Sequence, residues 1–194
     1  MMVKQIFVRI FDLIVHPQET WETIKTENVD GNVLRNKFYF PLIIMMIICA
    51  TIGSISSFIF EIEADFVTLF LESIKNAVVF FIAYFLGFFV VTLIFNELLA
   101  SPFFYMERDL DKCFTLFAYS SSLMWCIKAL VLLFPNMLFL YLLNFYAIYL
   151  IWTGAVVIFD NLQKEMTVKF TLIALLLLYC IPLGIENIML KLIP

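Results

Sequence analysis

Charged residues are scarce in this 194-residue chain, since Asp, Glu, Lys and Arg make up 14% of it, whereas a soluble globular domain carries about 25%. The 12 basic side chains are outnumbered by 16 acidic ones, which gives a net charge of −4. The chain also lacks a block of five or six basic residues, the usual signature of a polyanion-binding segment. We therefore expect no nucleic-acid partner.

Residue types that build catalytic and metal sites are also few. His16 is the single histidine, which excludes any site that needs two imidazoles, and no HExxH motif or glycine-rich phosphate loop is present. The four cysteines form no CxxC pair and lie in or beside apolar runs, where they are expected to act as small hydrophobic residues. Asp109-x-Asp111 has a spacing that holds Mg²⁺ in some enzymes, but acids just before an apolar helix are also favoured at its N-terminus. We expect no enzyme, no cofactor and no metal.

Apolar residues dominate instead, at 64% of the chain with 23 phenylalanines and a mean hydropathy of +1.02. A membrane-crossing helix needs about 20 mostly apolar residues. Five segments meet this condition, at about 38–60, 77–100, 113–134, 137–159 and 168–190. Because lipid cannot hydrogen-bond to open backbone groups, each segment should be a helix. The sequence thus predicts an all-α membrane protein, with a five-helix transmembrane bundle over residues 38–194 and a bend near Pro182 and Gly184.

Residues 1–37 form a more polar lead-in to this bundle. Its first polar side chains recur at helical spacing, namely Gln5, Arg9, Asp12 and His16. This pattern predicts an amphipathic helix that either lies at the membrane interface or packs on the protein's own spans. Pro17 opens a second short helix, in which Trp21 and Ile24 form a small apolar face. The Asp30-Gly31 pair predicts a turn before the first span.

Lysine and arginine predict the orientation, because they concentrate in cytoplasmic loops. One side carries nine of them, Lys4, Arg9, Lys25, Arg35, Lys37, Arg108, Lys112, Lys164 and Lys169. The other side carries Lys75 and Lys191, and Lys128 lies within the third span. We therefore expect a cytoplasmic N-terminus and a C-terminus outside.

Ionisable side chains inside apolar spans are the best pointers to function, because a charge at mid-bilayer costs about 2.5–3.5 kcal/mol on insertion scales. Lys128, Asn144 and Glu186 lie at comparable depth near the outer ends of three spans. We expect a Lys128–Glu186 pair with Asn144 as a further hydrogen-bond partner. This group is either a polar intramembrane pocket or a structural pair with a snorkelling lysine.

A second polar group lies towards the predicted cytoplasmic side. Its members are Asn96, Glu97, Ser120 and Ser121, with Ser122, Asp160 and Asn161 nearby. They either line an inward-facing cleft or, in the case of the serines, allow close helix packing and bond to their own backbone. The spacings Ala50-x-x-x-Ser54 and Gly53-x-x-x-Ser57 also predict close helix contact.

Three segments resemble a known family. Residues 16–24, HPQETWETI, contain the pattern Pro-x-x-x-Trp-x-x-Ile, and the other two are residues 114–120, FTLFAYS, and residues 144–154, NFYAIYLIWTG. Together they resemble the bacterial branch of the Yip-type membrane proteins, known in eukaryotes for interacting with Ypt/Rab GTPases, over residues 10–190. The resemblance implies five spans, a cytoplasmic N-terminus and an inner-membrane location. The acidic-Leu-x-Gly-Pro element that precedes the first span in eukaryotic members is not present, so GTPase binding is not carried over.

Two functions remain open at this point. The first is a non-enzymatic scaffold or interaction protein whose partners are the lipid bilayer together with other membrane proteins or further copies of itself. The alternative is a small transporter or channel that uses a polar pocket around Lys128. A cavity joining the two polar groups would favour the transporter, whereas charges paired in dry packing would favour the scaffold.

Overall fold

The computed structural model describes residues 3–59, 66–160 and 162–192, and every regular element within these ranges is helical. In chain order the elements are α1 (Val3–Val15), α2 (Pro17–Glu27), α3 (Gly31–Leu34), η1 (Arg35–Tyr39), α4 (Phe40–Ile59), α5 (Phe66–Leu99), α6 (Leu110–Leu133), η2 (Pro135–Asn144), α7 (Phe145–Ile158) and α8 (Lys164–Leu192). The described residues contain five helical stretches that are long and apolar enough to cross a membrane, namely Gly31–Gly53, Phe70–Leu99, Leu110–Leu133, Asn136–Ile158 and Lys164–Leu192. The predicted all-α class with five apolar spans is thereby confirmed.

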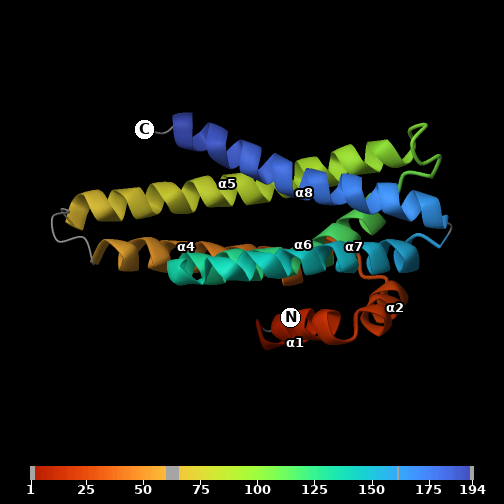
Figure 1. The fold of residues 1–194 in the computed structure, drawn as a ribbon, viewed down its shortest axis with the longest axis horizontal. Coiled ribbons are helices and arrows are strands. Elements are labelled where there is room, and N and C mark those ends of the chain that lie inside the picture. The colour runs from red at the N-terminus through yellow and green to blue at the C-terminus, as the bar shows by residue number, and fades with distance from the viewer. Residues whose placement is uncertain (1–2, 60–65, 161, 193–194) are drawn as a thin grey trace.

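The five long helices pack side by side in two layers, with α5 and α8 in one layer and α4, α6 and α7 in the other (Figure 1). Neighbouring helices close a ring, because α4 packs on α5 and α6, α7 packs on α6 and α8, and α8 packs on α5. The connections after α5 and after α7 lie at one end of the bundle. The connection between α6 and η2 lies at the opposite end, together with the C-terminal end of α8 (Figure 1).

Two glycines lie where one helix closely approaches the backbone of another. A Cβ atom on Gly53 of α4 would lie 1.9 Å from the backbone oxygen of Leu132 in α6, so these two helices touch through their backbones. A Cβ atom on Gly87 of α5 would lie 3.0 Å from the Cα atom of Pro182, which marks the contact between α5 and α8. The close α4–α6 contact involves the expected Gly53, while the side chains of Ser54 and Ser57 lie outside the described set.

The first two spans begin earlier than expected. The first long helix begins at Gly31 rather than near residue 38, because the Asp30 side chain accepts hydrogen bonds from the backbone N–H groups of Asn32 (2.7 Å) and Val33 (3.4 Å) and caps it. Its η1 segment is a π-helical turn that continues into α4 and contains the buried Phe38 and Tyr39. The second helix starts at Phe66, well before the expected residue 77.

The fourth span is not uniform along its length. It opens with η2, a 3₁₀ segment that contains a non-helical residue at Met137 (φ −97°, ψ 35°), and continues as α-helix from Phe145. The 3₁₀ segment η2 packs mainly on α6, whereas α7 packs on both α6 and α8. The difference matters because η2 carries Asn144.

The lead-in helices are attached to the side of the bundle, and α1 runs alongside the spans rather than across their end (Figure 1). Its buried apolar side chains are Ile6, Ile10 and Leu13, and its exposed ones are Phe7, Val8, Phe11, Ile14 and Val15. The Tyr146 hydroxyl, near the middle of the fourth span, donates a hydrogen bond to the Ile14 carbonyl (2.8 Å). The helix therefore packs on the protein's own spans with one apolar face and keeps a second apolar face exposed.

Candidate functional site

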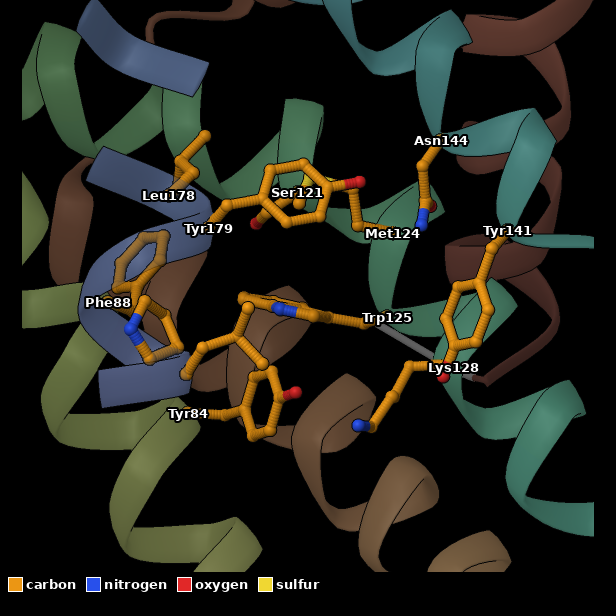
Figure 2. Close-up of a pocket in the computed structure, with 12 residues that line it drawn as sticks. Tyr84, Phe88, Ser121, Met124, Trp125, Lys128, Tyr141, Asn144, Leu178 and Tyr179 are labelled. Atoms are coloured by element: carbon orange, nitrogen blue, oxygen red, sulfur yellow. The ribbon is translucent and has the colours of Figure 1, made fainter. Parts of the chain in front are cut away.

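A pocket of about 240 Å³ lies between α5, α6, η2 and α8 (Figure 2). Its wall is formed by Tyr84 and Phe88 of α5, by Ser121, Met124, Trp125 and Lys128 of α6, by Tyr141 and Asn144 of η2, and by Leu178, Tyr179, Pro182 and Leu183 of α8. The wall is mostly aromatic and aliphatic with a few polar groups, which is the usual character of a small-molecule site.

Lys128 provides the positive charge of this pocket. Its Nζ atom lies 3.8 Å from Oε1 of Glu186, and both side chains are mostly buried, with 19% and 14% exposed. The same ammonium lies 5.2 Å from the ring centroid of Phe80 and 6.0 Å from that of Tyr84, distances at which an aromatic face stabilises a cation. A carboxylate and two rings thus replace the water that Lys128 would lose in a membrane.

Tyr84 completes the environment of Glu186. Its hydroxyl donates a hydrogen bond to Oε2 of Glu186 at 3.2 Å, while its own backbone carbonyl accepts one from the Tyr39 hydroxyl at 3.1 Å. Glu186 therefore has a different partner for each oxygen, the ammonium on one and a phenol on the other.

Asn144 lines the same pocket but takes no part in this ion pair. Its Oδ1 atom is buried and accepts no hydrogen bond from any described residue. The expected role of Asn144 as a hydrogen-bond partner of the pair falls instead to Tyr84. In the view of Figure 2, Asn144 and Tyr179 lie on one side of the Trp125 ring, and Lys128 and Tyr84 lie on the other.

The aromatic lining is the part of the site that the sequence analysis missed. Ser121, Trp125 and Lys128 follow the i, i+4, i+7 spacing of one helix face, so their shared orientation was readable from the sequence. The sequence does not show that Tyr84 and Tyr179 line the same pocket. They belong to α5 and α8, and the order of the helices around the bundle cannot be derived from the spacing of residues within one helix.

Trp21 forms a second close contact between distant segments, towards the other end of the bundle. Its side chain is fully buried, and a Cβ atom on Gly154 of α7 would lie 2.6 Å from its indole ring. The Trp21 ring also meets Tyr119 of α6 edge-on, with the centroids 6.1 Å apart. A single contact therefore joins all three segments that carry the family resemblance, residues 16–24, 114–120 and 144–154.

Comparison with protein families bears on this arrangement, since the family model described as the Yip1 domain matches residues 11–185. The chain belongs to the Yip1 family. Comparison with curated proteins and with solved structures found no match. The match begins within α1 and ends within α8, so it includes four of the apolar helices and the greater part of the fifth, and Glu186 lies one residue beyond it.

In this Yip1 domain the expected inner polar residues are separated. Ser121 lines the Lys128 pocket and donates a hydrogen bond to the Phe117 carbonyl at 2.6 Å, whereas Glu97 is exposed and pairs with Arg108 at 2.7 Å. Ser120 is fully buried, and neither its hydroxyl nor Oδ1 of Asn96 has a hydrogen-bond partner among the described residues. Of the nearby members, Ser122 donates to the Tyr119 carbonyl, Asp160 pairs with Lys25, and Asn161 lies outside the described residues.

Charged residues of the Yip1 domain also join the lead-in to the bundle. Arg9 of α1 pairs with Glu27 of α2 at 2.6 Å, and Lys25 of α2 pairs with Asp160 after α7. Asp109 acts as the N-cap of α6 by accepting a hydrogen bond from the Lys112 backbone N–H at 3.0 Å, which is the capping role expected for it. Among the described residues no three His, Cys, Asp or Glu side chains gather in a way that could hold a metal ion.

Proposed function

We propose that this Yip1-family protein is a non-catalytic interaction protein of the bacterial inner membrane, with its N-terminus in the cytoplasm and its C-terminus outside. In this role it joins other membrane proteins, or further copies of itself, through surfaces held rigidly by the five-helix bundle. The observation that carries the proposal is the two-sided α1 helix, which is fixed to the spans on one side and apolar on the other.

Several contacts support a fixed position for α1. Ile6, Ile10 and Leu13 are at most 5% exposed, and the ion pair of Arg9 with Glu27 ties α1 to α2, whose Trp21 and Ile24 are buried. On the opposite side Phe11 is 63% exposed. A rigid apolar helix face beside a membrane bundle suits helix-to-helix recognition, since its ordering cost is already met by the fold.

The orientation is supported by the distribution of basic residues. The connection between α5 and α6, which contains Arg108, lies at the same end of the bundle as the start of α8 at Lys164 (Figure 1). Nine basic residues fall on this predicted side against two on the other, and a bias of this kind favours the cytoplasm.

A photoreactive amino acid placed at Phe11 tests the interaction role in intact cells. The matched control is Leu176 of α8, which is similarly exposed, at 60%, but lies on a span. We expect discrete protein adducts from position 11 that position 176 does not give, and their mass distinguishes a second copy from another membrane protein. Adducts with lipid alone at both positions would refute the proposal.

A small transporter or channel remains the second candidate, and the pocket around Lys128 favours it. Ser121 belongs to the expected inner group and lines this pocket, but Asn96, Glu97 and Ser120 do not line it. A Lys128→Met variant reconstituted in liposomes tests this role, because a solute path through the pocket predicts a changed flux. A flux equal to that of empty liposomes for both proteins argues against transport.

A further inference from the structure

Helix α1 presents a second apolar face that the bundle leaves uncovered. Val8, Phe11 and Val15 are 49%, 63% and 46% exposed, and the exposed Lys4 lies on the same side of the helix. Lys4, Val8, Phe11 and Val15 follow one another at intervals of four, three and four positions, which is the seam spacing of two helices packed lengthwise. The outward face of α1 is therefore patterned for one further helix.

Two charged side chains of this face have no partner. Arg9 of α1 is paired with Glu27, whereas Lys4 and the half-buried Asp12 form no ion pair with any residue that the structure describes. Lys4 and Asp12 are eight residues apart in the sequence, which corresponds to about 12 Å along a helix. The face thus offers one unpaired positive charge and one unpaired negative charge, with Val8 and Phe11 between them.

The contacts of the lead-in place this face beside the membrane-crossing part of the bundle. The Tyr146 hydroxyl donates to the Ile14 carbonyl, and Tyr146 lies twelve residues, or about 18 Å, before the end of α7 at Ile158. Lys25 of α2 meets Asp160 just after that end. The lead-in therefore covers the predicted cytoplasmic half of the bundle, where an unpaired charge that faces lipid is costly. A helix that docks on α1 has to match both of its charges.

A second copy of the chain does not match these charges. Copies in one membrane have the same orientation, because the same basic residues decide it, and α1 runs alongside the spans (Figure 1). Two neighbouring α1 helices would therefore hold both Lys4 side chains at one depth and both Asp12 side chains at another. Like charges then meet across the contact, which opposes pairing. The complementary helix has to come from a different protein.

We infer that the outward face of α1 docks an apolar helix of a different membrane protein, and that this helix carries an acidic residue level with Lys4 and a basic residue level with Asp12. Apolar side chains of the partner pack on Val8, Phe11 and Val15. The inference rests on the proposed interaction role, and it specifies the partner of α1 by its charge pattern.

The test uses the full-length protein in phosphatidylcholine liposomes with synthetic membrane-spanning peptides, and energy transfer between labels on the protein and the peptide measures binding. The first peptide consists of leucine and alanine with one glutamate and one lysine, spaced as Lys4 and Asp12 are, and the control peptide has leucine at both positions. We expect the Glu/Lys peptide to bind at least about ten-fold more tightly, since each complementary pair replaces an unpaired charge. Equal binding of the two peptides would overturn the inference.

Charge reversal tests whether the two named side chains of α1 make this contact. Asp12→Lys leaves two positive charges on the face and should shift the preference to a peptide with glutamate at both positions. Lys4→Glu leaves two negative charges and should shift it to a peptide with two lysines. Glu19→Lys makes the same charge change on the exposed side of α2 and should keep the preference of the parent. An Asp12→Lys or Lys4→Glu protein that melts like the parent and keeps its preference would contradict the inference.

Failure of this inference is distinguishable from failure of the proposed role. Energy transfer between differently labelled copies of the protein, removed by Phe11→Ser, would show that α1 pairs with itself. That result would overturn the inference and leave the interaction role intact. Lipid adducts alone from a photoreactive group at position 11 would instead refute the role, and the inference with it.

Discussion

Gly53→Ala is the substitution for which the structure gives the sharpest expectation. The added Cβ atom would lie 1.9 Å from the Leu132 backbone oxygen and 2.6 Å from the carbonyl carbon. Real Cβ atoms essentially never lie closer than 3.0 Å to such a neighbour, so the carbonyl has to retreat by about 1.1 Å before the contact is tolerated. Because the neighbour is helix backbone, no side-chain rotation relieves the clash.

The energetic consequence follows from the packing of α4 on α6. Moving these helices apart loosens the buried layer formed by Leu42, Ile43 and Met46 of α4, and overpacking of this kind costs about 1–3 kcal/mol, occasionally more. The higher helix propensity of alanine returns about 0.5–1 kcal/mol. Since the clash is with backbone, we expect the upper part of the range, a net loss of about 2 kcal/mol in the free energy of unfolding.

Gly184→Ala is the matched control, because a Cβ atom at Gly184 of α8 has no neighbour within 4 Å. This variant gains helix propensity without a clash and should be neutral or more stable by up to about 1 kcal/mol. Unfolding by SDS in mixed micelles, followed by tryptophan fluorescence, measures both variants against the parent. Equal stability of Gly53→Ala and Gly184→Ala would refute the close α4–α6 contact.

Three further predictions concern the ion pair, the lead-in and the orientation. Lys128→Met should lower the free energy of unfolding by about 1–3 kcal/mol, less than the ~3–5 kcal/mol for a fully buried pair, because Tyr84 still donates to Glu186; a melting temperature equal to that of the parent contradicts it. Trp21→Ala should remove about 3–5 kcal/mol of packing from the α2 contact and make α2 sensitive to limited proteolysis, and retained resistance argues against the docking. In a cysteine-free background, a membrane-impermeant maleimide should label position 70 from outside and position 110 only after the membranes are opened; the reverse pattern overturns the orientation.

The number and class of the helices were predictable because membrane crossing imposes a length and an apolar composition that the sequence displays directly. The boundaries were less accessible, since they depend on local hydrogen bonds. The Asp30-Gly31 pair predicts a turn, yet the Asp30 carboxylate also caps the helix that begins at Gly31. At the fourth span, the 3₁₀ geometry of η2 reflects packing on α6, which no periodicity of residues 135–144 encodes.

Of the candidate site, only the pair of charged residues could be predicted from the sequence. A lysine within an apolar span needs a partner, and Glu186 lies at the matching depth of the last span, so the 3.8 Å approach of the two residues follows from burial and charge. The pocket itself depends on which helices are neighbours. Asn144 and Tyr179 line the same pocket because α7 rather than α4 packs on α8. The order of the helices around the bundle depends on how their side chains fit together.

The Lys128 pocket and the Trp21 contact of this Yip1 domain should respond to mutation independently. Asn144 precedes Gly154 by ten residues, almost all of them in α7, and at about 1.5 Å per residue this places the pocket roughly 15 Å from the Trp21 contact along the helix. Effects at sites more than about 7–10 Å apart with no shared partner are usually additive. The losses of unfolding free energy caused by Trp21→Ala and by Lys128→Met should therefore add, within about 0.5 kcal/mol, in the double variant. A double variant that lost clearly less stability than this sum would show that the docked lead-in and the Lys128 pocket form a single coupled unit.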